Sequence, residues 1–347
     1  MARGKLKIFV ALSLLTLATQ LTAAQPALTA ETSKAKQNSE SKQNSESVPA
    51  KPASKTSGWD HDYVLWGKQL SRFVADGNIH YKDWQKHQEG LIAFLKSADR
   101  LPAEEYNSFS REERIAFWIN LYNALCIKTV LDNYPIHGKV AQYPADSFRQ
   151  IANDWEAEKF NVMGTSITAY TIEHEKLRKD AKEPRIQFAV CCASRSCGRI
   201  QTQPYLPGTL EAQLEEATVR FLRDKKNVRI CTTPDKESFM VSKIFSWFTL
   251  DFARRAGFSK MQFPPPSDEE IIASYIRPYL IDSDKSNLDL VMKKRLEDPE
   301  RFQVKFDYLP YDWSLNDADK LAEAEKSAQV DTNKKEAAKK ETTTEIK

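Results

Sequence analysis

The stretch from Arg111 to Asn133 constrains the fold of this chain more than any other part of the sequence. Ser110, with Glu113 three residues later, has the pattern of a capping box and predicts that a helix begins here. Tyr134-Pro135 predicts where the helix ends, because the residue before a proline is disfavoured in a helix. Apolar residues occur on nearly every side of this helix. We therefore expect it to lie at the buried centre of the domain.

The other regular patterns are mostly helical. Apolar residues recur at helical spacing in 62–76, 83–98, 208–224, 243–256 and 267–280. A hairpin is expected over 161–172, and short strands rich in β-branched or aromatic residues are expected over 185–191, 227–231, 239–241 and 303–308. Strands and helices do not alternate regularly, which argues against a parallel α/β fold. The sequence thus predicts an α+β fold, a predominantly helical single domain with a small antiparallel sheet.

Residues 1–24 have the pattern of a secretory signal peptide. Three cations precede an apolar stretch, and a small-residue cleavage site follows near Ala24. The apolar stretch is shorter than the roughly 20 residues that a membrane-spanning helix needs. We therefore expect an exported product, periplasmic or secreted, with no stable membrane insertion after cleavage.

Two segments have the composition of disordered chain. Residues 25–58 are rich in Lys, Ser, Glu and Gln and contain the hexapeptide KQNSES twice, whereas 317–347 lack aromatic residues and alternate acids with lysines. Neither segment has enough apolar surface to order itself by burial. The folded domain is expected over 59–316, which is near the upper size of a single domain.

Charge and glycine content exclude several functions. The formal net charge is +3, and the three cations of residues 1–24 account for it, so the remaining chain is near neutral. Without a basic cluster interleaved with aromatic residues, binding to nucleic acid has no electrostatic basis. The chain has only 10 glycines and no glycine-rich phosphate loop, and it lacks a G-x-S-x-G motif. We expect no cofactor.

Six blocks of sequence resemble the family called domain of unknown function 547, and specifically its exported bacterial members. These blocks are AFWINLYNAL (116–125), YTIEHEKLR (170–178), PRIQFAVCCASRSC (184–197), LEEATVRFL (214–222), VSKIFSWF (241–248) and YLPYDWSLN (308–316). They occur in the order found in the family and span nearly all of the expected domain. By its name, the family implies no established activity.

The resemblance singles out a small set of polar residues. The positions that match the family's motifs are Asn120 and Asn123 on the central helix, the acid–histidine pair Glu173 and His174, and the two cysteines Cys192 and Cys197. The chain departs from the family at Gln187, where a histidine is frequent, and at Gly198-Arg199, where two prolines are usual. Loss of that histidine puts activity in doubt if it were the essential base, and loss of the prolines predicts a more mobile loop.

One hypothesis for these residues is a thiol-dependent hydrolase or acyl transferase acting on a peptide, amide or ester. Cys197 is the first choice as nucleophile, because Arg195 and Arg199 bring positive charge that would lower the pKa of its thiol. Cys192, at the end of an apolar run, is the second choice. His174 is the expected general base, oriented by Asn120 or Asn123, with Glu173 as a supporting carboxylate.

The alternative hypothesis is a non-catalytic envelope module for binding or structure. In an oxidising compartment Cys192 and Cys197 would form a disulfide, with Cys231 as a partner for Cys191. Cys192, Cys197 and His174 could also supply ligands to a metal ion, but the usual ligand spacings are absent, so no metal is expected. Asn120 and Asn123 would then only brace a neighbouring loop. The sequence leaves open whether the protein is an enzyme.

Overall fold

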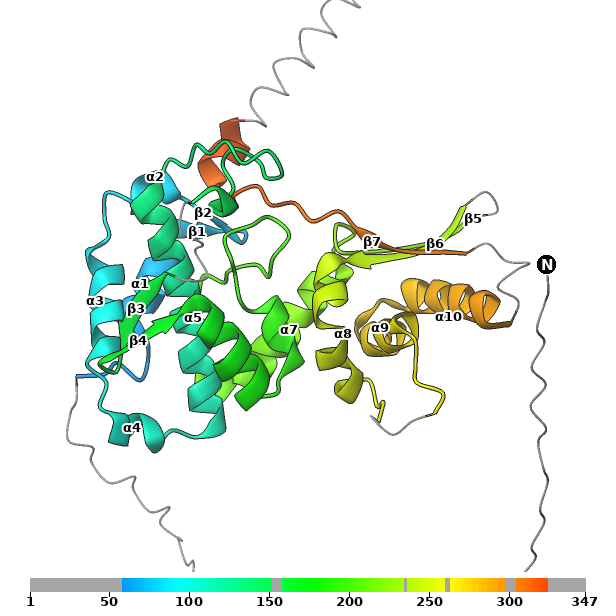
Figure 1. Cartoon of the computed structure of the whole chain (residues 1–347), viewed down its shortest axis with the longest axis horizontal. Coiled ribbons are helices and arrows are strands. Elements are labelled where there is room, and N and C mark those ends of the chain that lie inside the picture. Colours follow the sequence, from blue (N-terminus) through cyan, green and yellow to red (C-terminus); the bar gives the residue numbers. More distant parts are fainter. Residues whose placement is uncertain (1–57, 152–157, 234–235, 260–262, 298–303, 324–347) are drawn as a thin grey trace, which may run out of the picture. The chain divides into compact units, whose positions relative to one another are not determined.

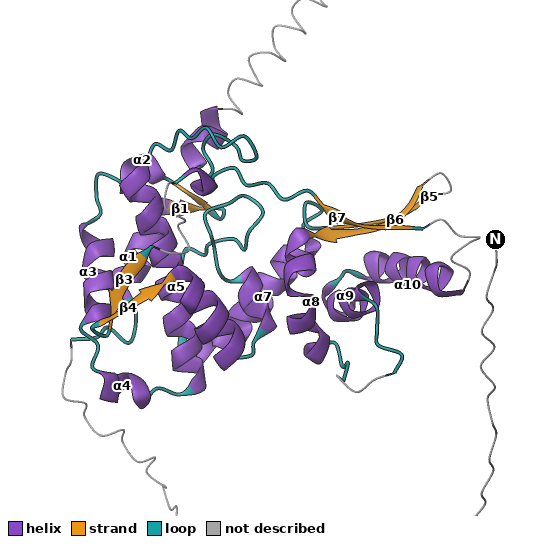
Figure 2. Cartoon of the chain, in the orientation of Figure 1, coloured by secondary structure: helices purple, strands orange, loops and turns teal. Residues whose placement is uncertain are grey.

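The computed structural model describes residues 58–151, 158–233, 236–259, 263–297 and 304–323 (Figure 1). Within these ranges helices predominate and the strands form small sheets, which confirms the α+β prediction (Figure 2). The signal peptide expected over 1–24 and most of the two low-complexity segments lie outside the described residues.

The first hydrophobic core surrounds α5 (Arg111–Asn133), which has the bounds predicted from the sequence. Its capping box is present, since the Ser110 hydroxyl accepts from the Glu113 backbone N–H and the Glu113 carboxylate accepts from the Ser110 backbone N–H. Every residue from 115 to 127 is buried, as expected for a helix that is apolar on nearly all sides. Around it lie α1 (Val64–Phe73), α2 (Tyr81–Trp84), α3 (Glu89–Asp99) and the short strands β1 (Val74–Ala75) and β2 (Asn78–Ile79).

The predicted hairpin is confirmed but is shorter than expected. Strands β3 (Lys159–Val162) and β4 (Thr165–Thr168) pair antiparallel. Met163 and Gly164 both have positive φ, as a two-residue hairpin turn of this hand requires. The chain then becomes helical in α6 (Ala169–Thr171) and in η3 (Ile172–Asp180), a π-helix that carries Glu173 and His174.

The second hydrophobic core lies between helices and a three-stranded sheet. Strands β5 (Val228–Thr233) and β6 (Lys236–Ser242) pair antiparallel, whereas β7 (Lys305–Leu309) runs parallel to β6, with Phe239 opposite Phe306. The two-stranded sheets are antiparallel as expected, and this third sheet is mixed. The helices of this half are α7 (Leu210–Arg223), α8 (Lys243–Arg255), α9 (Asp268–Ile276) and α10 (Asp282–Glu297).

The strand predicted over 185–191 is wrong. Residues Pro184–Phe188 form a 3₁₀ helix, η4, and the chain continues without regular structure. Proline at its first position favours a helical turn, and the backbone N–H groups of Ala189 and Val190 both donate to the carbonyl of Ile186. A short, fully buried apolar run gives no periodicity that separates a strand from a helical turn. We call residues 189–198 the cysteine segment.

Three helical regions also differ from the sequence predictions. The expected helix over 83–98 is divided between α2 and α3. Neither α4 (Ala103–Asn107) nor α10 was predicted. Helix α10 could not be predicted from periodicity, because it buries only Asp284, Leu288 and Val291 and so has little amphipathic pattern.

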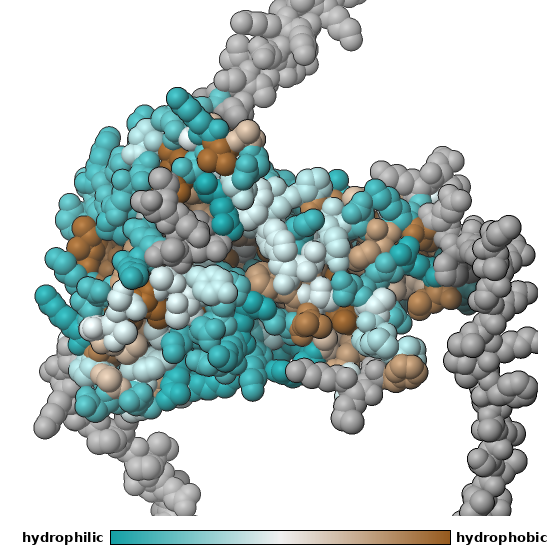
Figure 3. Space-filling model, in the orientation of Figure 1, coloured by the Kyte–Doolittle hydropathy of each residue, from teal (hydrophilic) through white to brown (hydrophobic). Residues whose placement is uncertain are grey.

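The described chain remains packed beyond residue 316. Asp317 is fully buried and accepts a hydrogen bond of 2.9 Å from the Tyr134 hydroxyl. It also forms a β-bridge with Ile79. In the view of Figure 3, hydrophobic residues form separate patches on a mostly hydrophilic surface. Among the described residues, none of the helices combines the length and apolar character needed to cross a membrane.

Candidate functional site

A cavity of about 480 Å³ brings together four of the six residues singled out from the sequence. Glu173 and His174 reach it from η3, and Cys192 and Cys197 reach it from the cysteine segment. Gln187, from η4, also lines it. The remaining wall is largely aromatic and is formed by Tyr122, Phe148, Trp247, Phe248, Tyr311 and Trp313. We call this cavity the aromatic pocket.

Asn123 braces the cysteine segment. Its side-chain nitrogen donates to the carbonyl of Ala189 over 3.2 Å, and its side-chain oxygen accepts from the backbone N–H of Cys191 over 2.8 Å. Asn120 does the same for another loop, exchanging two hydrogen bonds with the backbone of Tyr205. Both ends of each amide are therefore engaged by backbone, and neither asparagine lines the aromatic pocket. The structure supports the bracing role and gives no support to their role as orienters of His174.

The segment after β7 clamps the cysteine segment from its other side. The backbone N–H of Arg195 donates to the carbonyl of Ser314, and that of Asn316 donates to the carbonyl of Ala193. Ser194 and Leu315 form an antiparallel bridge. The YDWSLN block therefore holds the loop in place through its backbone, and Tyr311 and Trp313 of this block also contribute two rings to the pocket wall.

Gly198 fits tightly at the end of the cysteine segment. A Cβ atom at this position would lie 2.5 Å from the carbonyl oxygen of Phe188 and 2.7 Å from that of Val190. Only glycine leaves room for this close approach of two backbone segments. The absence of the family's proline here thus accompanies close packing of backbone on backbone.

The Cys197 thiol is enclosed by the loop that carries it. Its sulfur is 2.9 Å from the carbonyl oxygen of Ser194 and 3.4 Å from the sulfur of Cys191. Burial raises the pKa of Cys197 well above its ordinary value, which contradicts the expected lowering. The two arginines do not provide the expected field, because Arg195 donates to the Leu315 carbonyl and Arg199 pairs with Asp224.

The pairing of Cys191 also differs from expectation. Its sulfur lies against Cys197 and 3.4 Å from the side-chain nitrogen of Asn316. Cys231 belongs to β5, beside the second core. The prediction of Cys231 as partner assumed that 185–191 was a strand next to β5, and that strand does not exist. The structure has none of the five cysteines, all of them among the described residues, in a disulfide.

Cys192 is half-buried as a residue. Its sulfur is 3.3 Å from the Ser194 hydroxyl and 3.6 Å from the Tyr311 hydroxyl. A hydrogen bond with Cys197 and burial raise the pKa of Cys192 well above its ordinary value. The sulfur is therefore a neutral thiol at neutral pH in this arrangement, and attack on a substrate requires a base that removes its proton.

Glu173 and His174 offer two different groups to the pocket. The Glu173 carboxylate accepts a hydrogen bond of 3.0 Å from the Tyr122 hydroxyl. The Nδ1 atom of His174 is 2.6 Å from a terminal nitrogen of Arg178, and the ring packs on Tyr170. A guanidinium can only donate, so Nδ1 is the acceptor and the proton of the neutral ring is on Nε2. Arg178 fixes the tautomer of His174.

The aromatic wall was not identified from the sequence as part of a site. Trp247 lies 4.9 Å from Tyr311 and 5.7 Å from Trp313, measured between ring centroids. The Arg149 guanidinium lies 5.0 Å from the centre of the Trp313 ring. The signal was available in the blocks VSKIFSWF and YLPYDWSLN, but sequence alone could not indicate that their aromatic residues share a cavity.

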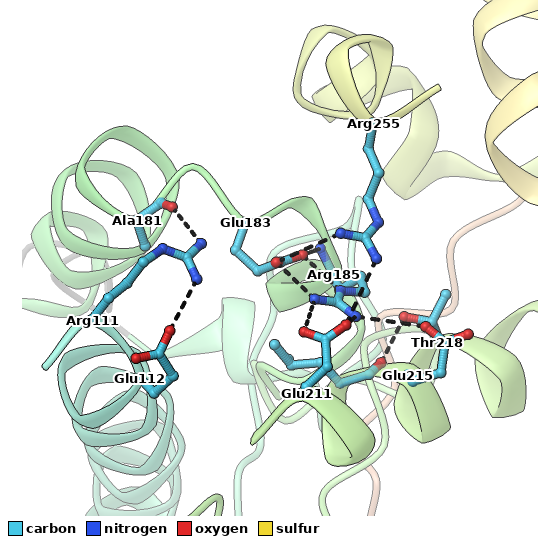
Figure 4. A network of polar contacts seen from close by, with 10 residues as sticks. Arg111, Glu112, Ala181, Glu183, Arg185, Glu211, Glu215, Thr218 and Arg255 are labelled. Carbon is cyan, nitrogen blue, oxygen red and sulfur yellow. Dashed lines mark hydrogen bonds and ion pairs between the residues drawn. The ribbon is translucent and has the colours of Figure 1, made fainter. Parts of the chain in front are cut away.

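A buried arginine anchors the 3₁₀ helix beside the pocket (Figure 4). Arg185 bonds Glu183 with two side-chain nitrogens and Glu211 with two more hydrogen bonds, and Glu215 and Arg255 extend the network. Burial alone would lower the pKa of Arg185, but its hydrogen bonds to Glu183 and Glu211 outweigh burial and raise it. This charged network holds the turn that carries Gln187.

No three His, Cys, Asp or Glu side chains among the described residues are grouped as a metal ion would require. The sequence hypothesis of a site formed by Cys192, Cys197 and His174 thus has no geometric support in the ranges that the structure covers.

Comparison with known proteins identifies the central part of the chain. Residues 106–222 match the family model described as a protein of unknown function, DUF547. This range contains all six residues singled out from the sequence, whereas Trp247, Tyr311 and Trp313 lie outside it. Neither the curated proteins nor the solved structures include a match to this chain. This match agrees with the resemblance that the sequence blocks indicated.

Proposed function

We propose that this protein is a thiol-dependent acyl-transfer enzyme, a hydrolase or acyl transferase, whose nucleophile is Cys192. One observation carries the proposal: a partly exposed cysteine lines the same 480 Å³ cavity as a glutamate and a histidine. A nucleophile, an acid–base group and a concave site are the parts that acyl transfer needs. From the signal-like pattern of residues 1–24, the proposal places the enzyme outside the cytoplasm.

The geometry favours Cys192 over Cys197. Both cysteines line the pocket. However, the Cys197 sulfur already contacts the Ser194 carbonyl and the Cys191 sulfur, and Cys197 is buried. Cys192 is the more exposed of the two. Besides its hydrogen bond with Cys197, Cys192 contacts the hydroxyl groups of Ser194 and Tyr311, which can donate to a thiolate as it forms. The order of preference inferred from the sequence is therefore reversed.

His174 is the proposed base, and Arg178 controls when it can act. While Arg178 donates to Nδ1, that lone pair is occupied and Nε2 carries the proton. Arg178 is also bonded to Asp251 through Nε. When Arg178 turns to Asp251 alone, a ring nitrogen of His174 becomes free to accept the thiol proton. Glu173, held by Tyr122, is the other candidate base in the pocket.

The test is the alkylation of the full chain by iodoacetamide over a range of pH, with each labelled cysteine identified by peptide mass. We expect Cys192 to react first, with an apparent pKa above the free-thiol value of about 8.5. A screen of ester and amide substrates with Cys192→Ser, His174→Gln and the matched control Cys126→Ser completes it. Activity that survives Cys192→Ser would overturn the proposal.

The sulfur contacts favour a second candidate, the non-catalytic envelope module. Cys191 and Cys197 have sulfurs 3.4 Å apart, so a small movement under oxidising conditions would join them. A disulfide there would make the cysteine segment a structural staple. Peptide mapping without reductant distinguishes the candidates, because a Cys191–Cys197 bond with an unreactive Cys192 supports the module alone.

A further inference from the structure

We propose that the side-chain amide of Gln187 donates the hydrogen bond that receives the carbonyl oxygen of the substrate in the aromatic pocket. The inference rests on the proposed function, since it assigns a catalytic residue to acyl transfer at Cys192. It accounts for a buried polar group that the fold itself leaves without a partner.

Gln187 is buried and its donor is unused. Gln187 is 3% exposed and lines the aromatic pocket. Its side-chain nitrogen has no hydrogen-bond partner among the described residues. Nearly all buried polar groups in folded proteins have a partner, and an exception calls for an explanation. Asn120 and Asn123, the neighbouring buried amides, use both ends of their side chains.

The position of Gln187 is fixed from both sides. Two residues before it, Arg185 is held by Glu183 and Glu211 (Figure 4). One residue after it, Phe188 is buried in the second core and stacks on Phe252 at 5.8 Å between ring centroids. A donor held in this way does not need to reorganise when charge develops on a substrate oxygen, and such preorganised donors contribute strongly to acyl transfer.

Two other donors of this region are engaged in the structure. The backbone N–H of Cys191 donates to Asn123. Arg178 is shared between His174 and Asp251. The amide of Gln187 lines the pocket and has no partner among the described residues, so it is free to meet a new oxygen. A neutral amide also suits a neutral ester or amide carbonyl before attack, because no ion pair has to be broken.

The proposed reaction forms a thioester at Cys192 and then hydrolyses it. The Cys192 sulfur bonds to the carbonyl carbon, the π electrons of the carbonyl move to its oxygen, and the thiol proton passes to His174. The Gln187 N–H donates to the oxygen while it is negative. When the carbonyl forms again, the alcohol or amine leaves with the proton from His174. Water then cleaves the thioester and restores the thiol.

The experiment compares two reagents at the same sulfur in the purified full chain. p-Nitrophenyl acetate acylates a thiol through a tetrahedral oxyanion, whereas iodoacetamide alkylates it by displacement at a saturated carbon. Rates at Cys192 are measured by peptide mass. The variants are Gln187→Met, which removes the donor at similar size, and Gln187→His, which keeps an N–H. Gln201→Met is the control, since Gln201 bonds the Tyr205 hydroxyl and does not line the pocket.

We expect Gln187→Met to slow acylation about 10²- to 10³-fold, as loss of one oxyanion donor does, while alkylation changes little. Gln187→His should recover most of the acylation rate, and Gln201→Met should match the unaltered protein. Equal loss with both reagents would assign Gln187 a structural role and overturn the inference, as would unchanged acylation. If neither reagent labels Cys192 in the unaltered protein, the proposed function itself fails.

Discussion

The two walls of the aromatic pocket are built in different ways. One wall, from η4 through the cysteine segment, is held by buried hydrogen bonds and ion pairs: Arg185 with its glutamates, and Asn123 with the backbone of the segment. The other wall, formed by Trp247, Tyr311 and Trp313, is held by ring contacts, and Trp247 is 41% exposed. The proposed nucleophile Cys192 and the proposed donor Gln187 lie on the braced wall, and the groups suited to recognition lie on the aromatic one.

The difference matters because removing a partner has a different energetic cost in the two kinds of contact. A buried charge or amide that loses its partner keeps the full cost of its desolvation. A partly exposed ring that is removed leaves a space that water can fill. Changes to the braced wall should therefore appear as lost stability, and changes to the aromatic wall as lost binding with stability retained.

Arg185→Met should have the largest effect. It leaves the Glu183 carboxylate, whose side chain is 6% exposed, without its main partner. Removing one member of a buried ion pair costs about 3–5 kcal/mol. We expect the free energy of unfolding, measured with urea, to fall by that amount. Arg277→Met is the matched control, because the Arg277–Asp289 pair is exposed, and an equal loss there would contradict the comparison.

Asn123→Ala should have an intermediate effect. It leaves the Ala189 carbonyl and the Cys191 N–H unpaired in a buried place, and an unsatisfied buried group costs about 1–3 kcal/mol. Urea unfolding measures the loss, and iodoacetamide labelling should show faster reaction of the loosened cysteine segment. In Asn133→Ala, which removes one part-buried side-chain hydrogen bond to the Thr129 carbonyl at the end of α5, both quantities should stay near those of the unaltered protein. Similar values for the two variants would show that Asn123 does not stabilise the braced wall.

Trp247→Ala should have the smallest effect on stability and a specific effect on recognition. An aromatic pair contributes about 0.5–1.5 kcal/mol beyond burial, so alkylation of Cys192 by a naphthyl iodoacetamide should slow roughly 2- to 12-fold. Alkylation by iodoacetamide itself should not slow. Leu250→Ala, at an 83% exposed position of the same helix, is the control. Slowing of both reagents to the same degree would show that Trp247 supports the fold and not a ligand.

Much of the fold could be predicted from the sequence because its signals are local. The capping box and the proline gave the bounds of α5, and the turn at Met163-Gly164 gave the hairpin. The 185–191 strand was wrong because a buried apolar run has no period. Helix α10 was missed because few of its residues are buried, and the parallel pairing of β7 depends on contacts distant in sequence.

The site was predictable only in part. The family blocks indicated Glu173, His174, Cys192 and Cys197, and the structure brings these into one cavity. The choice between the two thiols depended on where Arg195 and Arg199 point, which sequence does not encode locally. The role of Arg178 and the unused donor of Gln187 depend on atomic contacts between segments that no spacing rule describes.

The placement of Phe188 has a mechanical consequence. Ile186, Ala189 and Cys191 pack in the first core, whereas Phe188, between them, packs in the second. The chain that leads to Cys192 is therefore packed in both hydrophobic cores, and Phe188 provides its contact with the second. A displacement of one core relative to the other would therefore shift this loop, and we expect the reactivity of Cys192 to change with it.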